Sequence, residues 1–459
     1  MSNINSYDYK VTIYIVNHNY GKYIDECIKS VLSQTFRDYE VIIFDCGSSD
    51  NSRNIIESYS NNKNFKIIFL NNQPLAMTNN IALAMSRSEY IIRLDADDFL
   101  HENAIGILTG ILDRNSSLGL VFPDYYEIDN EGNILSLVRR HNFKNVTLRD
   151  QPAHGACTLI RRSILEKVGG YDEEFTCQDG WDLWLKVTDI SEVFNTNLPL
   201  FYYRRHNSNL TKDETKLLKT RSEILAKYNS SKGESSKGVA IIPIRGGNDK
   251  DSNYWMSKIL GVPLLNRAID TSLSSISIDK VVVSSPDQNI LDYVKKEYKD
   301  NVLTVKREMT KSFTHEFLDE SIFQIMGIYS DLCKNNIAGL IINIEYPFLN
   351  SNDFDSAINA LLAFNTDLVL GVRKETRNVY QHSGHGLTNI SNKINFKNEN
   401  NETYILGGLQ AFRFNALNNF GSLNKINTIG HIILDEKSFY YISSNFALDL
   451  VKNTEKTSK

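Results

Sequence analysis

Regular alternation of short apolar strands with amphipathic helical segments is the feature that most restricts how this chain can fold. Runs rich in β-branched and apolar residues lie at residues 11–16, 40–44, 66–70 and 90–94, and apolar residues recur at helical spacing between them. This rhythm is typical of a parallel sheet covered by helices, in which ligands bind along the edge formed by the strand C-termini. The first half of the chain is therefore predicted to have an α/β fold.

Polar clusters follow three of these strands, and they lie at residues 17–19, 45–49 and 95–98. In the third cluster, Asp95, Asp97 and Asp98 need a counter-charge, because repulsion and desolvation would otherwise raise their pKa values. A divalent cation that carries a diphosphate would supply this charge. The structural alternative is a solvated loop that caps the helix beginning near Glu102, since Asp is a preferred N-cap residue.

The composition of the chain is that of an ordinary globular protein. It has 459 residues, of which 41% are hydrophobic and 23% are charged, so sizeable cores can be buried. At ~100–200 residues per domain, about two to four domains are expected. A net charge of -5 without a basic cluster argues against a nucleic-acid partner.

The cysteines and the N-terminus bear on where the protein works. The five cysteines are scattered without a C-x-x-C pair, which fits a reducing cytosol and gives no sign of zinc or redox chemistry. The first residues lack the basic and apolar regions of a signal peptide, and no apolar stretch reaches the ~20 residues of a membrane span. The sequence predicts a soluble, cytoplasmic protein and leaves open peripheral attachment at the inner face of a membrane that holds a lipid-linked acceptor.

Motifs in the first half of the chain resemble those of the family 2 glycosyltransferases, which have a GT-A fold. They occur in the order expected for that family and lie at residues 11–13, 19–24, 30–42, 45–50 and 94–98. The resemblance implies a nucleotide-sugar donor, with Asp97 of the D-x-D motif binding a divalent cation (Mn²⁺ or Mg²⁺) on the donor diphosphate. It places Asp45 near the nucleotide base. Further donor contacts are expected from Val16, Asn17, Asn79 and Asp95.

Two positions depart from the pattern of that family. Cys46 stands where a second Asp often contacts uracil, and Asn79 stands, before Asn80, where the family often has an Arg. A thiol is only a weak hydrogen-bond donor and cannot replace a carboxylate acceptor. The base of the donor nucleotide is therefore left open.

A helix is predicted within residues 178–187, and Asp179 lies just before its first turn. Asp179 could be a structural N-cap that contributes ~1 kcal/mol. In the resembling family the general base lies in this stretch and takes the proton of the attacking sugar hydroxyl. Asp182 is the alternative base, but a residue one turn inside a helix more often faces the protein. Trp181 and Asp182 are the expected acceptor contacts.

An aromatic strand at residues 198–203 runs into Arg204, Arg205 and His206. In the resembling family a Tyr-Arg-x-His stretch follows the catalytic helix and closes over the donor. Arg204 or Arg205 would then neutralise phosphate, with Arg204 counted among the donor contacts, and His206 would be a further metal ligand. The alternative is a set of ordinary surface residues at a strand end.

A small, polar segment at residues 230–237 has the composition of a linker. Strand–helix alternation resumes after it, with apolar runs at residues 239–243, 279–285, 338–343 and 367–372. We therefore expect one domain at residues 1–229 and a second α/β domain at residues 238–459, joined by this linker.

Motifs in the second half resemble the cytidylyltransferases that activate sialic acid and related ketodeoxy sugars as CMP derivatives. They lie at residues 241–247, 260–265 and 281–287. Tyr254 and Trp255 replace the expected Lys and Asn, and Ser443 stands near the expected metal-binding Asp. A phenol and a hydroxyl supply neither positive charge nor a strong Mg²⁺ ligand. The second domain is therefore predicted to keep the fold without nucleotidyl transfer, and to bind acceptor or mediate assembly, including homo-oligomers.

Together these patterns predict two Rossmann-like α/β domains of the nucleotide-diphospho-sugar-transferase type in tandem, a GT-A domain followed by a cytidylyltransferase-like domain. The predicted activity is metal-dependent, inverting transfer of a sugar to a saccharide, lipid-linked or protein acceptor in surface glycan biosynthesis. One base without an evident nucleophile favours a single displacement. Two alternatives stay open: a non-catalytic carbohydrate-binding or scaffold protein, and a bifunctional enzyme that also makes its own CMP-sugar.

Overall fold

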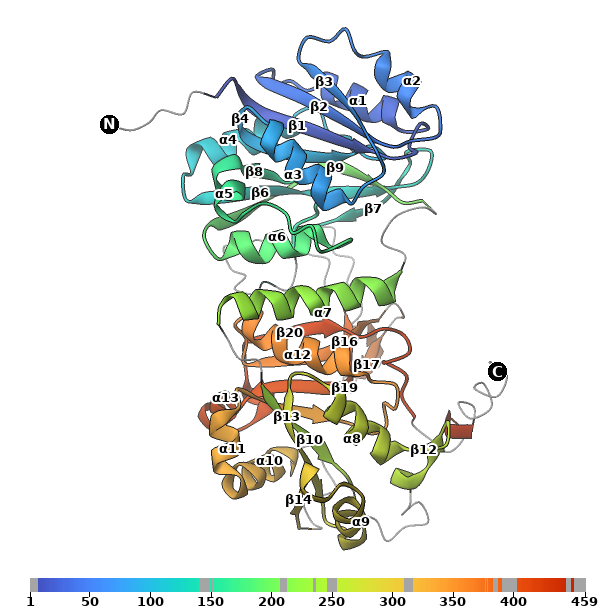
Figure 1. Ribbon diagram of the computed structural model, residues 1–459, viewed down its shortest axis with the longest axis vertical. Helices are drawn as coiled ribbons and strands as arrows, with labels where there is room; N and C mark the ends of the chain where they lie inside the picture. The colour runs from blue at the N-terminus through green and yellow to red at the C-terminus, as the bar shows by residue number, and fades with distance from the viewer. Residues whose placement is uncertain are drawn as a thin grey trace. The chain divides into compact units, whose positions relative to one another are not determined.

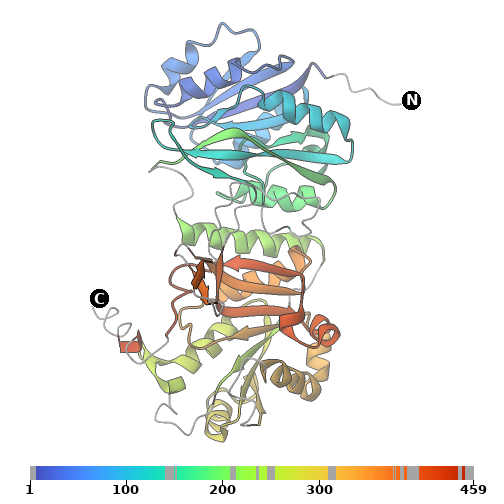
Figure 2. The same cartoon turned by 180° about the vertical axis from the view of Figure 1, so that it is seen from behind.

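The computed structural model describes residues 7–139, 149, 152–206, 213–233, 237–245, 254–308, 317–375, 377, 379–382, 387–389, 403–442 and 447–449. The chain divides into two compact units, and the division falls between Asp213 and Glu214 (Figures 1 and 2). Each unit is built on one large β-sheet with helices packed against it. The tandem α/β fold expected from the sequence is confirmed.

The sheet of the N-terminal unit begins with parallel strands, as predicted. Its first four strands are β1 Tyr9–Asn17, β2 Tyr39–Cys46, β3 Phe65–Leu70 and β4 Ser88–Asp95. β1 pairs in parallel with β2 and β4, and β2 pairs in parallel with β3. The central strands β1, β2 and β4 are almost entirely buried, which explains why they read as continuous apolar runs.

The remainder of this sheet is mixed. Its other strands are β5 Phe99–Leu100, β6 Leu118–Ile128, β7 Ile134–Val138, β8 Leu159–Arg161 and β9 Glu192–Arg204. Among the described residues the strand order is β3-β2-β1-β4-β8-β6-β9-β5, with β7 beside β6. β8 runs antiparallel to both β4 and β6, whereas β9 runs parallel to β6. The carboxyl end of β9 therefore returns to the edge at which β1, β2 and β4 end.

Helices cover both faces of this sheet, because alternate residues of a strand point to opposite sides. Val11, Ile13 and Ile15 of β1 face one core, and Tyr14 faces the other. The helices of the first core are α1 Ile24–Leu32, α2 Ser52–Glu57 and α4 Ala104–Arg114. The helices of the second core are α3 Leu75–Met85, α5 Arg162–Lys167 and α6 Asp179–Thr188 (Figure 1).

Strand register brings the ends of the central strands of the N-terminal unit together. Val16 of β1 lies opposite Asp95 of β4, and Asn17 of β1 lies opposite Asp45 of β2. The polar clusters that follow these strands therefore meet at one edge of the sheet. This is the edge at which open α/β sheets bind ligands.

The C-terminal unit has its own sheet, in the order β14-β13-β10-β15-β19-β16-β20 among the described residues. These strands are β10 Gly238–Pro243, β13 Ile278–Ser285, β14 Val302–Lys306, β15 Ala338–Ile342, β16 Leu368–Lys374, β19 Tyr404–Arg413 and β20 Ile429–Ile433. β10 pairs in parallel with β13 and β15, and β13 with β14, whereas β19 is antiparallel to β15 and β16. Two short hairpins accompany it, β11 Lys258–Ile259 with β12 Val262–Pro263 and β17 Tyr380–His382 with β18 Leu387–Asn389.

Helices of the C-terminal unit also lie on both faces of its sheet. They are α7 Glu214–Ser231, α8 Leu264–Ser274, α9 Gln288–Tyr298, α10 Phe317–Ile328, α11 Ser330–Asn335, α12 Ser351–Ala363 and α13 Phe414–Phe420. α10, α11 and α13 share one core with Val239, Ile241 and Phe412. α12 packs against β16, β19 and α8, and α7 packs against α12.

The second compact unit begins earlier than the sequence suggested. We expected the first domain to extend to residue 229, which would have placed α7 in it, but α7 packs on α12 of the second unit. Asn229 Nδ2 donates hydrogen bonds to Asn359 O (3.0 Å) and Asn359 Oδ1 (2.9 Å), and Ile224 and Leu225 are buried. The apolar periodicity of α7 predicts a packed helix without saying which unit it packs against.

The described part of the chain also shows the state of the cysteines and the length and polarity of the helices. All five cysteines are free thiols, and only Cys177 is not buried. No helix among the described residues combines the length and the apolar character that crossing a bilayer requires.

Candidate active site

The ends of β1 and β2 form a hydrogen-bonded corner around Asp45. Asn17 Nδ2 donates to Asp45 Oδ2 (2.9 Å) and to Ser48 Oγ (3.0 Å). Asp45 Oδ1 accepts from the Ser48 backbone N–H (3.1 Å) and from Arg53 Nε (3.1 Å). Burial acts to raise the pKa of Asp45, but the hydrogen bonds from Ser48, Asn17 and Arg53 outweigh it and hold that pKa below its ordinary value. Asp45 is therefore a fixed, ionised group at the sheet edge.

Cys46, which replaces an Asp of the resembling family, lies in the core. Its side chain is buried on the face covered by α3, with Sγ 3.6 Å from Thr78 Oγ1. Burial raises the pKa of the Cys46 thiol, so it stays neutral. A neutral thiol below the sheet edge offers a nucleotide base no carboxylate.

The three carboxylates at the end of β4 each contact a different partner. Arg93 Nε lies 3.0 Å from Asp95 Oδ1, and the Arg204 backbone N–H donates to Asp98 Oδ1 (2.8 Å). Burial raises the pKa of Asp95 to about 6 although Arg93 opposes this, and burial with the charges of Asp97 and Asp95 raises the pKa of Asp98 well above its ordinary value. The carboxylates thus lie close together, as expected from the sequence, and their partners offset the mutual repulsion only in part.

Asp97 pairs with His206, and these are the two residues expected to bind metal. His206 Nε2 lies 2.8 Å from Asp97 Oδ2, and the imidazole packs against the rings of Tyr20 (edge-on) and Tyr23 (stacked), each with its centroid 5.6 Å away. Carboxylate oxygen and imidazole nitrogen are both donors that Mn²⁺ accepts. Within the described residues no third His, Cys, Asp or Glu completes a metal site, so the pair fits two ligands of an ion whose other ligands come from elsewhere.

Arg204 points into the protein. Its side chain is almost fully buried, and its guanidinium donates to the carbonyl oxygens of Asp97 (2.9 Å), Asp129 (3.0 Å) and Asn130 (3.2 Å) and pairs with Glu26. These contacts differ from the phosphate contact expected for Arg204, because the charge is already surrounded by protein acceptors. The residue instead holds the D-x-D turn against the turn between β6 and β7.

Arg205, the alternative phosphate contact, lies on the surface. Its side chain is half-exposed, and its Nε lies 3.1 Å from Glu127 Oε1. Adjacent arginines at the end of β9 therefore have opposite environments.

Asp179 is the first residue of α6 and does not cap it. The N-cap is Gln178, which has a left-handed backbone with φ of 60° and makes no side-chain capping bond. Asp179 Oδ2 accepts hydrogen bonds from Asn79 Nδ2 (2.8 Å) and Arg93 Nη1 (2.7 Å). Its Oδ1 accepts no hydrogen bond from the described part of the chain, and the side chain keeps 11% exposure. One oxygen is held and the other is available.

Asp182, the alternative base, pairs with Lys186 of the same helix at 2.5 Å. Trp181 lies beside it and is largely buried. Asp179, for its part, contacts Arg93 of the strand that ends in the D-x-D motif.

Sequence reasoning missed Arg93 and the contact of Asn79 with Asp179. The donor contact expected of Asn79 stays a prediction; within the protein, Asn79 links the Tyr14 hydroxyl (3.2 Å) to Asp179. Arg93 was given no role, although a charged residue inside a buried strand must find a partner. That rule was the available signal, and it could not say that the partner would be Asp179.

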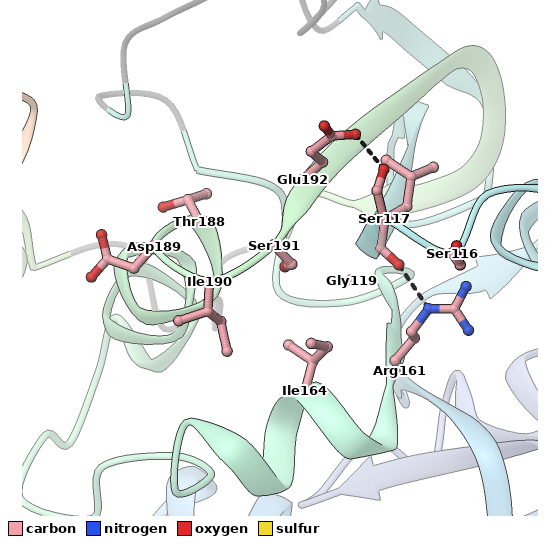
Figure 3. A pocket seen from close by; sticks show the side chains of 11 residues that line it. Ser116, Ser117, Gly119, Arg161, Ile164, Thr188, Asp189, Ile190, Ser191 and Glu192 are labelled. Carbon is pink, nitrogen blue, oxygen red and sulfur yellow. Dashed lines mark hydrogen bonds between the residues drawn. The ribbon is translucent and has the colours of Figure 1, made fainter. Parts of the chain in front are cut away.

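A separate hollow of about 490 Å³ lies at the opposite ends of β6 and β9. Figure 3 shows Ile164 and Ile190 pointing toward each other across it, while Ser117 donates to Glu192 and Arg161 donates to a backbone carbonyl. None of the predicted site residues lines this hollow. The candidate active site is therefore defined by its chemistry at the carboxyl edge of the sheet.

The corresponding edge of the C-terminal unit carries tyrosines. The Tyr254 hydroxyl donates to the Ile442 carbonyl (3.1 Å), and burial raises the Tyr254 pKa. The neighbouring Trp255 is buried against Tyr293, with ring centroids 5.2 Å apart. Both residues are packed as parts of the fold, and Ser443 lies outside the described residues.

Each half of the chain matches one family model. Residues 12–169 match the model of glycosyl transferase family 2, and residues 239–457 match the model of the cytidylyltransferases. The resemblance expected for each half is confirmed.

Similar proteins share mainly the N-terminal half. Chondroitin synthase of Escherichia coli is 29% identical over 203 residues, which cover 43% of this chain and 29% of that protein. Glycosyltransferase GlyG of Streptococcus pneumoniae is 24% identical over 261 residues, which cover 51% of this chain and 84% of that protein. The match thus spans less than a third of the length of the synthase.

Among solved structures, S. aureus TarS 1-349 in complex with UDP-GlcNAc is 13% identical, with a TM-score of 0.43, and the match covers 87% of this chain and 99% of that one.

Proposed function

We propose that this protein is a metal-dependent, inverting glycosyltransferase that moves a sugar from a nucleotide-sugar donor to a saccharide, lipid-linked or protein acceptor. The observation that carries the proposal is the geometry of Asp179, whose Oδ2 is held by Arg93 and Asn79 while its Oδ1 accepts no hydrogen bond within the described chain. A carboxylate that is fixed in place and still has an available oxygen suits a general base.

The donor would lie along the ends of β1, β2 and β4. Val16, Asn17, Asp45 and Asp95 meet there in register. Asp97 and His206 would hold a divalent cation, Mn²⁺ or Mg²⁺, which when bound stabilises the charge of the departing diphosphate. Arg204 keeps the turn that carries Asp97 in place through the Asp97 carbonyl.

The transfer is a single displacement in this proposal. Asp179 Oδ1 removes the proton of an acceptor hydroxyl, and the acceptor oxygen forms the new bond to the anomeric carbon. The bond from that carbon to the diphosphate oxygen breaks, and the diphosphate leaves with the electron pair. Because the site offers one base, a single displacement with inversion is favoured over a covalent intermediate. Trp181 and Asp182, which follow Asp179 on α6, are the proposed acceptor contacts.

The C-terminal unit would bind acceptor or mediate assembly, including homo-oligomers. In support, Tyr254 is engaged by the Ile442 carbonyl at the position where nucleotidyl transfer needs a cation. The cellular context would be surface glycan biosynthesis, in keeping with relatives named for glycosyl transfer.

A screen of nucleotide sugars tests the donor assignment. Purified full-length protein is melted with each nucleotide sugar, with and without Mn²⁺, because a ligand that binds only the native state raises the melting temperature. Donors that stabilise the protein are then incubated with saccharide acceptors and the released nucleotide is measured. Stabilisation by some nucleotide sugar that depends on Mn²⁺, followed by release of the nucleotide, is the expected result. If no nucleotide sugar stabilises the protein, the proposal fails.

A further inference from the structure

Arg93 joins two carboxylates that come from distant parts of the N-terminal unit. Its side chain is 7% exposed, with Nε 3.0 Å from Asp95 Oδ1 and Nη1 2.7 Å from Asp179 Oδ2. Asp95 ends the same strand, whereas Asp179 begins α6. One guanidinium thus contacts both the donor-side carboxylate and the proposed base.

The guanidinium of Arg93 is confined by a glycine. A Cβ atom built on Gly155 would lie only 2.6 Å from Arg93 Nη2. The same segment is fixed to β4, because the Cys157 backbone N–H donates to the Arg93 carbonyl (2.8 Å). A side chain at residue 155 would therefore displace the guanidinium from its present position.

A second chain of hydrogen bonds fixes Asp179 from the other side. The Tyr14 hydroxyl donates to Asn79 Oδ1 (3.2 Å), which orients the amide so that Asn79 Nδ2 donates to Asp179 Oδ2 (2.8 Å). Burial raises the pKa of Tyr14 well above its ordinary value, so the phenol keeps its proton and remains the donor. Arg93 and Asn79 thus both donate to Oδ2 of Asp179 and leave Oδ1 available.

The titratable groups around Asp179 come from three parts of the chain. β4 contributes Arg93 and Asp95, β1 contributes Tyr14, and the segment before α6 contributes Tyr171, whose hydroxyl lies 3.4 Å from that of Tyr14. Burial acts to lower the pKa of Arg93, but the charges of Asp95 and Asp179 have a larger opposite effect. The pKa of Arg93 is therefore well above its ordinary value. Arg93 is therefore a permanent cation facing Asp179.

We propose that Arg93 is the positioning residue of the transfer reaction, which aims Asp179 Oδ1 at the acceptor and ties the orientation of this base to the donor-side carboxylate Asp95. The inference rests on the proposed function and deepens it. A planar guanidinium can contact two carboxylates in one fixed geometry, whereas an ammonium acts as a point charge. Charge and geometry at this position can therefore be tested separately.

The main test compares Arg93→Gln with Arg93→Lys. In Arg93→Gln, kcat should fall by about 10²-fold because a misplaced base loses its alignment. The acidic limb of the kcat/KM profile should move to higher pH, because the cation that faces the base has been removed. Arg93→Lys should keep the wild-type pH profile and recover only part of kcat. The donor Kd, measured by calorimetry, should change much less than kcat in both.

Two further variants serve as controls. Gly155→Ala keeps every charge but displaces the guanidinium, so kcat should fall while the pH profile stays in place; this variant carries the test if Arg93→Gln does not fold. Arg114→Gln, at the exposed end of α4, is a matched Arg-to-Gln control and should leave all parameters unchanged.

The outcomes separate the two ideas. Wild-type kcat and an unmoved pH profile in Arg93→Gln, in an enzyme that transfers sugar, would overturn the positioning role alone. A wild-type protein that binds no nucleotide sugar and transfers nothing would overturn the proposed function together with this inference.

Discussion

The carboxyl edges of the two sheets differ in how their charged side chains are arranged. In the N-terminal unit, buried Arg93 pairs with Asp95 and Asp179, and Asp97 pairs with His206 close by. In the C-terminal unit, Arg245 and Arg307 follow β10 and β14, and among the described residues neither pairs with a carboxylate. Burial and the charge of Arg245 lower the pKa of Arg307 to about 10.

Aromatic side chains also pack at the second edge. A Cβ atom built on Gly408 of β19 would lie 2.3 Å from the ring of Tyr346, whose centroid is 5.1 Å from that of Tyr441. Both edges are thus well packed. The second edge presents the carboxylate of Glu345 among aromatic rings, whereas the first edge holds several carboxylates against buried arginines. The comparison teaches that a few side chains at the strand ends decide the chemistry of a scaffold that both units share.

The strongest way to break this contrast is to neutralise the proposed base. We expect Asp179→Asn to lower turnover by ~10²–10⁴-fold, the range for loss of a general base, because an amide cannot accept the acceptor proton. Donor binding and thermal stability should stay near those of the wild type. Steady-state kinetics on Asp179→Asn and Asp182→Asn provide the measurement. A large loss in Asp182→Asn alone would reverse the assignment of the base.

The metal pair gives the next largest effect. In Asp97→Ala, the Kd of a nucleoside diphosphate in the presence of Mn²⁺ should rise about tenfold or more, equivalent to ~1.4 kcal/mol or more. Removing the carboxylate leaves His206 as the one protein ligand of the proposed pair. Titration calorimetry with Mn²⁺ and with EDTA measures the difference, and an unchanged dependence on Mn²⁺ would count against the metal assignment.

Neighbouring arginines sharpen the comparison on the stability side. Arg204→Met should cost about 3 kcal/mol, because the carbonyls of Asp97, Asp129 and Asn130 lose a buried, charged donor. Arg205→Met, at a half-exposed position, should change the free energy of unfolding by about 0.5 kcal/mol or less. Denaturant unfolding of both variants is the measurement. Equal losses would show that burial of Arg204 contributes little.

The smallest expected effect concerns the C-terminal edge. Full-length protein should release no pyrophosphate from CTP with any nonulosonic or ketodeoxy acid, because Tyr254 supplies no positive charge to the triphosphate. A coupled pyrophosphate assay makes the measurement. Release that depends on the sugar and disappears in Arg245→Ala would instead establish a bifunctional enzyme and remove the contrast between the units.

Local patterns predicted the fold well, because buried parallel strands and amphipathic helices are visible in short windows of sequence. They also predicted that Asn17, Asp45 and Asp95 would lie at one edge of the sheet, because the carboxyl ends of parallel strands meet there. They could not predict the contact of Arg93 with Asp179, which joins residues 86 positions apart. The inward direction of Arg204 and the unit to which α7 belongs were missed for the same reason, because each depends on a distant packing partner.

The contacts of Arg204 also set an order of assembly for a chain made from its N-terminus. The guanidinium supports the Asp97 carbonyl from a position 107 residues further along the chain, and His206 follows two residues later. The parallel strands β1 to β4 are synthesised long before either group exists. A nascent chain that ends before β9 therefore has its D-x-D turn without this support, and the proposed metal site is completed only after residue 206 has been translated and β9 has docked beside β6. Closing so long a loop comes late, because its entropy must be offset by strand pairing already in place.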